Sequence, residues 1–234
     1  MASMPKLLFI PGMMCDERLF APQIAALADR AEVICARLDG PPSIEGLARM
    51  LLAEHSGALS LAGLSMGGIV AMEMVRQASD RIERLALLDT NHHADLVERF
   101  ETRNRQIVDA REGRLSTVIA EEMRPAYFAA ANGNDAVLQA LVLDMAMGLG
   151  PDVFERQSIA LRDRRDQTDA LLSYDGPALV LCGTEDRLCP LSRHEEIARL
   201  LSDSECVFVE QAGHLSTLER PDAVTLALAH WLNR

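Results

Sequence analysis

The sequence holds one short motif whose residue types and spacing suit nucleophilic chemistry. In Gly63-Leu64-Ser65-Met66-Gly67, a serine stands between two glycines, after an apolar run and before a helical pattern. Glycines on both sides relieve crowding in a tight, strained turn, so the hydroxyl can project from the edge of a sheet. The motif therefore predicts Ser65 as a nucleophile at a strand-to-helix turn.

A serine hydroxyl is a weak nucleophile at neutral pH, so it needs a base and a carboxylate that orients the base. Both occur later in the chain in the order Ser, Asp, His, with Asp186 and His214 each just after an apolar run. Since the carboxyl ends of parallel strands share one edge of a sheet, we expect Ser65, Asp186 and His214 to meet there. Asp89, which also ends an apolar run, and Glu185 compete with Asp186 for the carboxylate role.

Two other interpretations of the glycine-rich turn fit less well. Gly63, Gly67 and Gly68 with Asp89 suggest a dinucleotide site, but that fingerprint requires glycine where this chain has Ser65. Ser65 as a simple helix cap would explain the serine but would leave Asp186 and His214 without a role. The nucleophile is therefore the preferred interpretation.

A metal site is not predicted. His92-His93-x-Asp95 offers possible ligands, but no third ligand motif accompanies it. We interpret all the histidines other than His214 as surface or packing residues, and we expect neither a metal nor a cofactor.

The elements that must position these residues follow from the hydrophobic pattern. Up to about residue 90, short apolar runs alternate with segments of helical spacing, which predicts parallel strands joined by crossover helices. The expected strands are 7–10, 31–36, 58–62, 85–88, 178–182 and 206–209, and the expected flanking helices are 21–27, 43–54, 66–78, 193–201 and 222–232.

The strand pattern is interrupted in the middle of the chain. Residues 92–172 show helical periodicity without a convincing strand, with Asn132-Gly133 and the stretch 148–151 as breaks. We expect five helical stretches there, 97–108, 115–123, 136–147, 151–160 and 164–172. Residues 1–91 and 173–234 would then form one α/β core, and residues 92–172 a helical cap inserted after the strand that ends at Asp89.

Composition limits the class of protein. The chain has 234 residues, 49% of them hydrophobic, which suffices for one core of ordinary size. A net charge of −12 disfavours nucleic acid and anionic membrane surfaces as partners. The five cysteines have no Cys-x-x-Cys pair, and the start of the chain lacks a secretory signal, so we expect a cytoplasmic protein.

These motifs together resemble the α/β-hydrolase superfamily, specifically its small, capped, cofactor-free serine esterases such as pimeloyl-ester carboxylesterases and proline iminopeptidases. The resemblance covers nearly the whole chain. Its landmarks are Leu8-Phe9-Ile10-Pro11-Gly12, the Ser65 turn, Gly183-Thr184-Glu185-Asp186, and Gly213-His214 followed by Glu219-x-Pro221.

The resemblance implies hydrolysis of a small carboxylic ester through an acyl-enzyme, with Ser65, Asp186 and His214 as the triad. It also implies an oxyanion hole formed by backbone N–H groups, which by position are those of Met13 and Met66. The family usually has His-Gly in the first loop, whereas this chain has Pro11-Gly12, and Met14 therefore remains an alternative donor.

The substrate is the least determined feature, because caps vary freely on one scaffold. Met14, Phe128 and Met145 are candidates for lining an apolar acyl pocket. The same triad also supports amide, thioester or carbon–carbon cleavage, lyase chemistry and perhydrolysis, and a binding protein on this fold is a further alternative. We expect a small-molecule partner, and a homodimer remains open.

Overall fold

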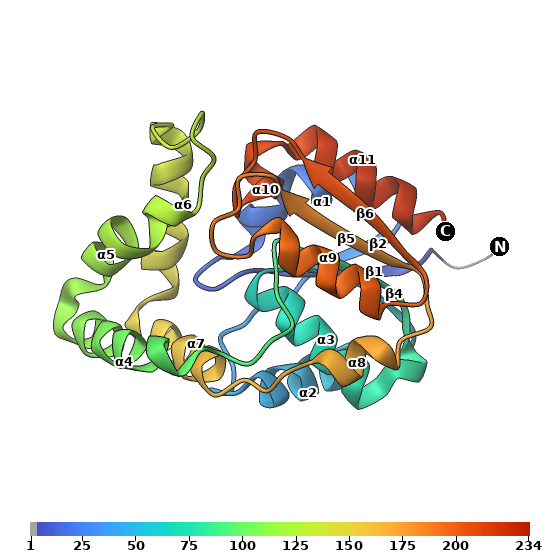
Figure 1. Ribbon diagram of the computed structural model, residues 1–234, viewed down its shortest axis with the longest axis horizontal. Coiled ribbons are helices and arrows are strands. Elements are labelled where there is room, and N and C mark those ends of the chain that lie inside the picture. The colour runs from blue at the N-terminus through green and yellow to red at the C-terminus, as the bar shows by residue number, and fades with distance from the viewer. Residues whose placement is uncertain (1–3) are drawn as a thin grey trace.

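A computed structural model describes residues 4–234, so the first three residues of the predicted core segment 1–91 lie outside the described part. Its centre is a sheet of six parallel strands in the order β2-β1-β3-β4-β5-β6 (Figure 1). The strands are β1 (Lys6–Ile10), β2 (Glu32–Cys35), β3 (Leu59–Leu64), β4 (Ile82–Leu88), β5 (Ala178–Gly183) and β6 (Ser204–Val209). The predicted α/β fold is confirmed.

The inner strands are apolar over most of their length because both faces of the sheet are covered, and their charged residues, Lys6, Glu83 and Arg84, lie near the amino ends of β1 and β4. Alternate residues of one strand point to opposite faces, so Leu7 and Phe9 belong to one core cluster and Leu8 and Ile10 to the other. The first cluster contains residues of α1 (Ala21–Leu27) and α11 (Pro221–Leu232). The second contains residues of α2 (Ile44–Glu54), α3 (Met66–Ala78), α8 (Thr168–Leu172) and α9 (Leu191–Leu200). This double burial is the reason for continuous apolar runs instead of alternation.

The helices that follow the first strands begin where the sequence predicts. The Ser43 hydroxyl accepts a hydrogen bond from the Gly46 N–H at 3.1 Å and caps α2. The α3 helix begins at Met66, directly after the serine of the glycine-flanked motif. A short helix, α10 (Ser216–Glu219), precedes α11 near the end of the chain.

The segment between β4 and β5, which lies wholly within the described residues, is mostly helical and contains no strand, and the two strands pair with each other in parallel. Its helices are α4 (Phe100–Asp109), α5 (Leu115–Thr117), α6 (Ala136–Leu149) and α7 (Pro151–Arg162), with α8 after them. A single turn of 3-10 helix, Val97–Arg99, leads into α4, and two π-helical segments, Ala110–Arg114 and Val118–Met123, flank α5. The predicted helical stretch 115–123 is helical throughout, as one turn of α-helix followed by a π-helix.

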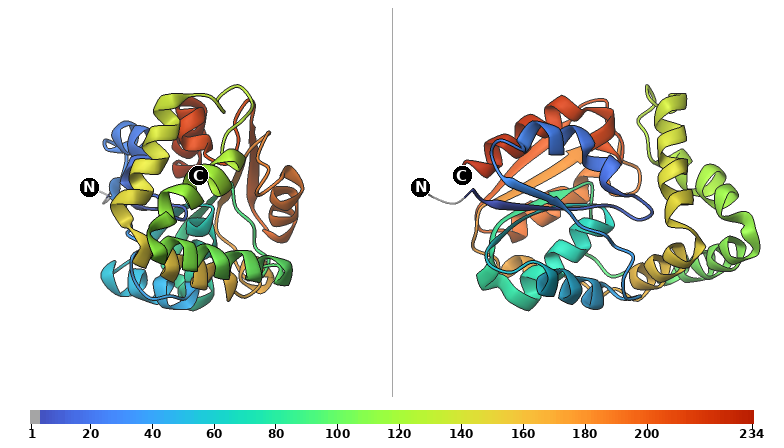
Figure 2. Two further views of the ribbon diagram at one scale, coloured as in Figure 1. Left: turned by 90° about the vertical axis from the view of Figure 1, so that its left-hand side faces the viewer. Right: turned by 180° about the vertical axis from the view of Figure 1, so that it is seen from behind.

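The helices α4, α5, α6 and α7 lie beyond the end of the sheet toward which β5 and β6 point (Figure 1). The view from behind shows α4, α5 and α6 on that side as well (Figure 2). The α8 helix instead packs against α3 and α9. It begins only at Thr168, four residues after the predicted start, and the division of the chain into core and cap stays a prediction.

Among residues 4–234, no single helix is long and apolar enough to cross a membrane. The pair α6 and α7, bent by 95°, meets the length and composition criteria only when the two are taken together.

Candidate active site

Ser65 occupies the sharp turn between β3 and α3. Its backbone has φ 55° and ψ −116°, a conformation that side chains rarely adopt. A Cβ on Gly63 would lie 2.3 Å from the carbonyl oxygen of Gly67, and a Cβ on Gly67 would lie 1.9 Å from that of Ile10. Both glycines are therefore needed for the turn to form, as the motif predicts.

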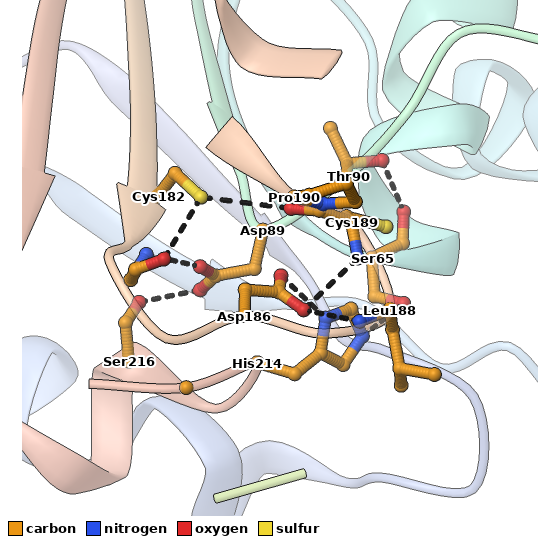
Figure 3. Close-up of polar contacts among 12 residues, drawn as sticks. Ser65, Asp89, Thr90, Cys182, Asp186, Leu188, Cys189, Pro190, His214 and Ser216 are labelled. Atoms are coloured by element: carbon orange, nitrogen blue, oxygen red, sulfur yellow. Dashed lines mark hydrogen bonds and ion pairs between the residues drawn. The ribbon is translucent and has the colours of Figure 1, made fainter. Parts of the chain in front are cut away.

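The structure brings Ser65, His214 and Asp186 into one hydrogen-bonded chain (Figure 3). Ser65 Oγ lies 2.8 Å from His214 Nε2, and His214 Nδ1 lies 2.8 Å from Asp186 Oδ2. Each residue follows the carboxyl end of a strand, β3, β6 and β5 respectively. The order of acceptors and donors is that of a nucleophile, its base and the group that orients the base.

Asp186 is itself held by the loop that carries it. Its Oδ1 accepts hydrogen bonds from the backbone N–H groups of Leu188 at 2.8 Å and Cys189 at 2.9 Å, which leaves Oδ2 for His214. Backbone donors of this kind fix the orientation of the carboxylate.

The two competing carboxylates are engaged elsewhere. Asp89 is fully buried, and its oxygens accept hydrogen bonds from the Gly183 N–H, at 2.8 Å, and from the Ser216 hydroxyl. Glu185 accepts a hydrogen bond from the Ala130 N–H at 2.8 Å. Neither of them hydrogen-bonds to His214, so the geometry selects Asp186.

The electrostatics of the site follow from burial and from two close acidic groups. Burial and then the neighbouring Asp186 charge raise the pKa of Asp89 well above its usual range. Burial alone lowers the pKa of His214, but the charge and hydrogen bond of Asp186 outweigh it and raise that pKa above 6.5. The imidazolium form of His214 is therefore stabilised in the folded site.

The loop of His214 is tied to the segment that follows α5. The backbone N–H of His214 donates to the Tyr127 carbonyl at 2.8 Å. Glu219 accepts hydrogen bonds from the N–H groups of Gly213 at 2.7 Å and Ala129 at 2.8 Å. Glu219, which the sequence offers only as a landmark, thus joins the histidine loop to the helical segment between β4 and β5.

The candidate oxyanion donors differ in what they already bind. The Met14 N–H donates to Gln157 Oε1 at 2.8 Å, so it is occupied. The N–H groups of Met13 and Met66 donate to no group within residues 4–234. Met13 and Met66 therefore retain the open donors that an oxyanion hole requires.

A cavity of about 310 Å³ opens over Ser65 and His214. Its apolar walls include Met13, Met123, Tyr127, Leu161 and Leu188. This volume is at the lower end of the range for small-molecule sites, roughly 300–1,000 Å³.

The predicted pocket residues Met14, Phe128 and Met145 are not among the residues that line this cavity. All three are buried in the first core cluster. Phe128 directly follows Tyr127, which lines the cavity although it belongs to the same core cluster. Residues 127 and 128 lie outside any helix, so helical periodicity does not determine which of them faces the cavity.

Sequence reasoning missed a polar wall of the cavity. Arg99, Thr102, Arg103 and Gln106 all line it, and Arg164 adds a further guanidinium. The spacing of the first four, at i, i+3, i+4 and i+7, places them on one face of a helix. The signal was present in the sequence, but polar residues at this spacing are ordinarily assigned to a solvent-facing surface.

The histidine pair near the start of the helical segment gains a third neighbour from a distant part of the chain. His92, His93 and Glu196 place possible ligand atoms within 4.8 Å of one another. Both nitrogens of His93 already contact carboxylates, Asp166 at 3.0 Å and Glu196 at 3.2 Å. The third residue lies on α9, about a hundred residues away, so no local motif could have revealed it.

The chain is similar to known hydrolases over nearly its whole length. The sequence model of the alpha/beta hydrolase family matches residues 7–227. A malate-bound thermophilic esterase from Thermogutta terrifontis is 29% identical with a TM-score of 0.90, over 99% of this chain and 90% of that one. The enol-lactonase from Burkholderia xenovorans is 26% identical with a TM-score of 0.89, over 100% and 93%.

A bromoperoxidase from Bacillus anthracis, 17% identical with a TM-score of 0.80 over 99% of this chain and 93% of that one, shares the fold. Together with the parallel sheet and the serine turn after β3, the match to the family model over residues 7–227 shows that this chain belongs to the α/β-hydrolase family.

Proposed function

We propose that this protein is a serine hydrolase that cleaves small carboxylic esters through an acyl-enzyme intermediate. The observation that carries the proposal is the hydrogen-bonded chain from Ser65 through His214 to Asp186, with 2.8 Å at both steps. The similarity to an esterase and to an enol-lactonase supports ester chemistry, since a lactone is a cyclic ester. The five cysteines are free thiols, which supports a reducing compartment such as the cytoplasm.

The mechanism follows from the geometry of these groups. His214 Nε2 takes the proton of Ser65 Oγ as that oxygen bonds to the ester carbonyl carbon. The N–H groups of Met13 and Met66 stabilise the oxyanion that forms. His214 then gives its proton to the leaving alcohol as the carbon–oxygen bond breaks. In the second half, water attacks the acyl-enzyme, His214 takes its proton, and the acid is released with Ser65 restored.

The test is labelling with a fluorophosphonate probe followed by intact-mass analysis and peptide mapping. We expect one adduct, on Ser65, and hydrolysis of p-nitrophenyl acetate and butyrate that persists in EDTA. Ser65→Ala should abolish both, whereas Ser56→Ala, at an exposed serine, should leave both unchanged. Adducts only at other serines, or turnover that survives Ser65→Ala, would contradict the proposal, and labelling without any turnover would favour a binding protein.

A further inference from the structure

The polar wall of the cavity is cationic in a chain that is strongly acidic overall. Arg99, at the end of the 3-10 turn, and Arg103, one turn later in α4, face the cavity, and Arg164 faces it from the stretch that follows α7. The whole chain carries a net charge of −12, so a concentration of guanidinium groups beside the nucleophile is not a general property of its surface.

One buried carboxylate holds two of these arginines in place. Arg103 Nε donates to Asp95 Oδ2 at 2.6 Å, and Arg164 Nη1 lies 3.1 Å from Asp95 Oδ1. The side chains of Arg103, Arg164 and Asp95 are 11%, 5% and 1% exposed. The hydrogen-bonded ion pair with Asp95 orients Arg103. Arg164 is held in addition by hydrogen bonds that it donates at 2.9 Å to the backbone carbonyls of His93 and Leu161.

Arg99 and Arg103 keep N–H donors that are able to bind a ligand. The Nη groups of Arg103 and the whole guanidinium of Arg99 donate to no group within residues 4–234. Three guanidinium groups face one carboxylate, Asp95, so the cluster carries an excess of about two positive charges. Glu122 also lines the cavity, but Arg105 and Gln106 already donate to it at 3.0 Å.

We propose that the cavity selects esters that carry a free carboxylate away from the scissile bond, and that Arg99 and Arg103 bind this carboxylate. The apolar walls at Met123, Tyr127 and Leu161 would hold the short carbon chain between the carboxylate and the ester. A planar guanidinium matches a carboxylate through two parallel N–H donors, which a neutral ester end does not satisfy. This inference rests on the proposed ester hydrolysis.

The kinetic test compares pairs of substrates in which the end group is either a free carboxylate or its neutral methyl ester. The half p-nitrophenyl esters of succinate, glutarate, adipate and suberate are each measured against the same compound with its free carboxylate methylated. We expect kcat/KM to favour the anionic member by about 10-fold or more at the best chain length, as for hydrogen bonds to charged groups. The preference should weaken as ionic strength rises.

Variants at an exposed position keep this test independent of folding. Arg99 is exposed at the cavity, so Arg99→Gln should reduce the preference several-fold and Arg99→Glu should reduce it further. Arg111→Gln removes the same charge from the same helical segment, at a side chain that is 61% exposed and does not line the cavity, and should leave the ratio unchanged. Equal rates for both substrate series, or a ratio that both Arg99 variants leave unaltered, would overturn the inference.

A binding experiment separates this inference from the proposed function. Calorimetry with the Ser65→Ala protein should show monomethyl glutarate binding about 10-fold more tightly than dimethyl glutarate. If the wild-type protein hydrolyses no ester, the proposed function is wrong, and the calorimetry still decides whether the carboxylate site exists. If neutral esters are hydrolysed but the monomethyl ester binds no more tightly than the dimethyl ester, the proposed function stands and the carboxylate site is refuted.

Discussion

The backbone N–H of Met14 donates a hydrogen bond at 2.8 Å to the side-chain Oε1 of Gln157, a residue 143 positions later in the chain. The same side chain donates through Nε2 to the Leu38 carbonyl at 2.9 Å. One amide on α7 thus joins the loop after β1, which carries Met13, to the loop after β2. The helical segment between β4 and β5 therefore helps to position the loop that we expect to bind the oxyanion.

Replacing this amide should impair both stability and turnover. Gln157→Leu leaves the Met14 N–H and the Leu38 carbonyl buried without partners, each costing about 1–3 kcal/mol. We expect Tm to fall by roughly 2–4 °C per kcal/mol, and kcat to fall about 10-fold with a smaller change in KM. Thermal unfolding measures Tm, and steady-state kinetics with p-nitrophenyl butyrate measure kcat. Wild-type values of Tm and kcat in Gln157→Leu would show that the Gln157 side chain does not position the Met13 loop.

The two buried carboxyl groups near His214 should respond differently to the same substitution. Asp186→Asn should lower kcat by about 10³- to 10⁴-fold while the fold is kept, because the amide holds the wrong tautomer of His214. Asp89→Asn should cost about 10-fold or less, since Asp89 bonds to Gly183 and Ser216 instead. Kinetics on both variants, with circular dichroism as the folding control, would contradict this assignment if the two effects were reversed.

The activity should decline on the acid side because of His214. The base must be neutral to accept the Ser65 proton, and the Asp186 charge raises the pKa of His214 above 6.5. As pH falls through that raised pKa, His214 becomes protonated and kcat/KM decreases, so the midpoint should lie above pH 6.5. A kcat/KM profile from pH 5 to 9 measures it, and a midpoint below pH 6 would contradict the role given to the Asp186 charge.

The size of the cavity should limit the acyl chain. A volume of about 310 Å³ favours short or medium chains, so kcat/KM for p-nitrophenyl esters should fall steeply before palmitate. Met123→Ala, at a wall residue, should shift the optimum to longer chains, each buried methylene contributing about 0.8 kcal/mol. Met147→Ala, at a methionine that is 48% exposed and does not line the cavity, is the matched control. A flat profile to palmitate would mean that the cavity does not enclose the chain.

Much of the fold was predictable because its signals are local. Apolar runs between helical patterns predicted all six strands in order, and α1 and α3 begin and end at the predicted residues. The need for glycine on both sides of Ser65 was also predictable, because the close contacts arise within the turn itself and with the end of the neighbouring strand β1. Prediction was less accurate over 164–172, where the helix begins only at Thr168, and over 115–123, where the helix changes after one turn from α-helix to π-helix and so departs from the α-helical period.

The sequence by itself therefore determined the α/β architecture, the turn that holds Ser65 and the chain order of Ser65, Asp186 and His214. Only the tertiary structure decided that Asp186, and not Asp89, contacts His214, because both aspartates follow strands at the same edge of the sheet. It also decided that the Met14 N–H is occupied and that the polar face of α4 lines a cavity instead of solvent. Local patterns separate apolar from polar residues, but the partner of a polar group is set by packing between segments far apart in the chain.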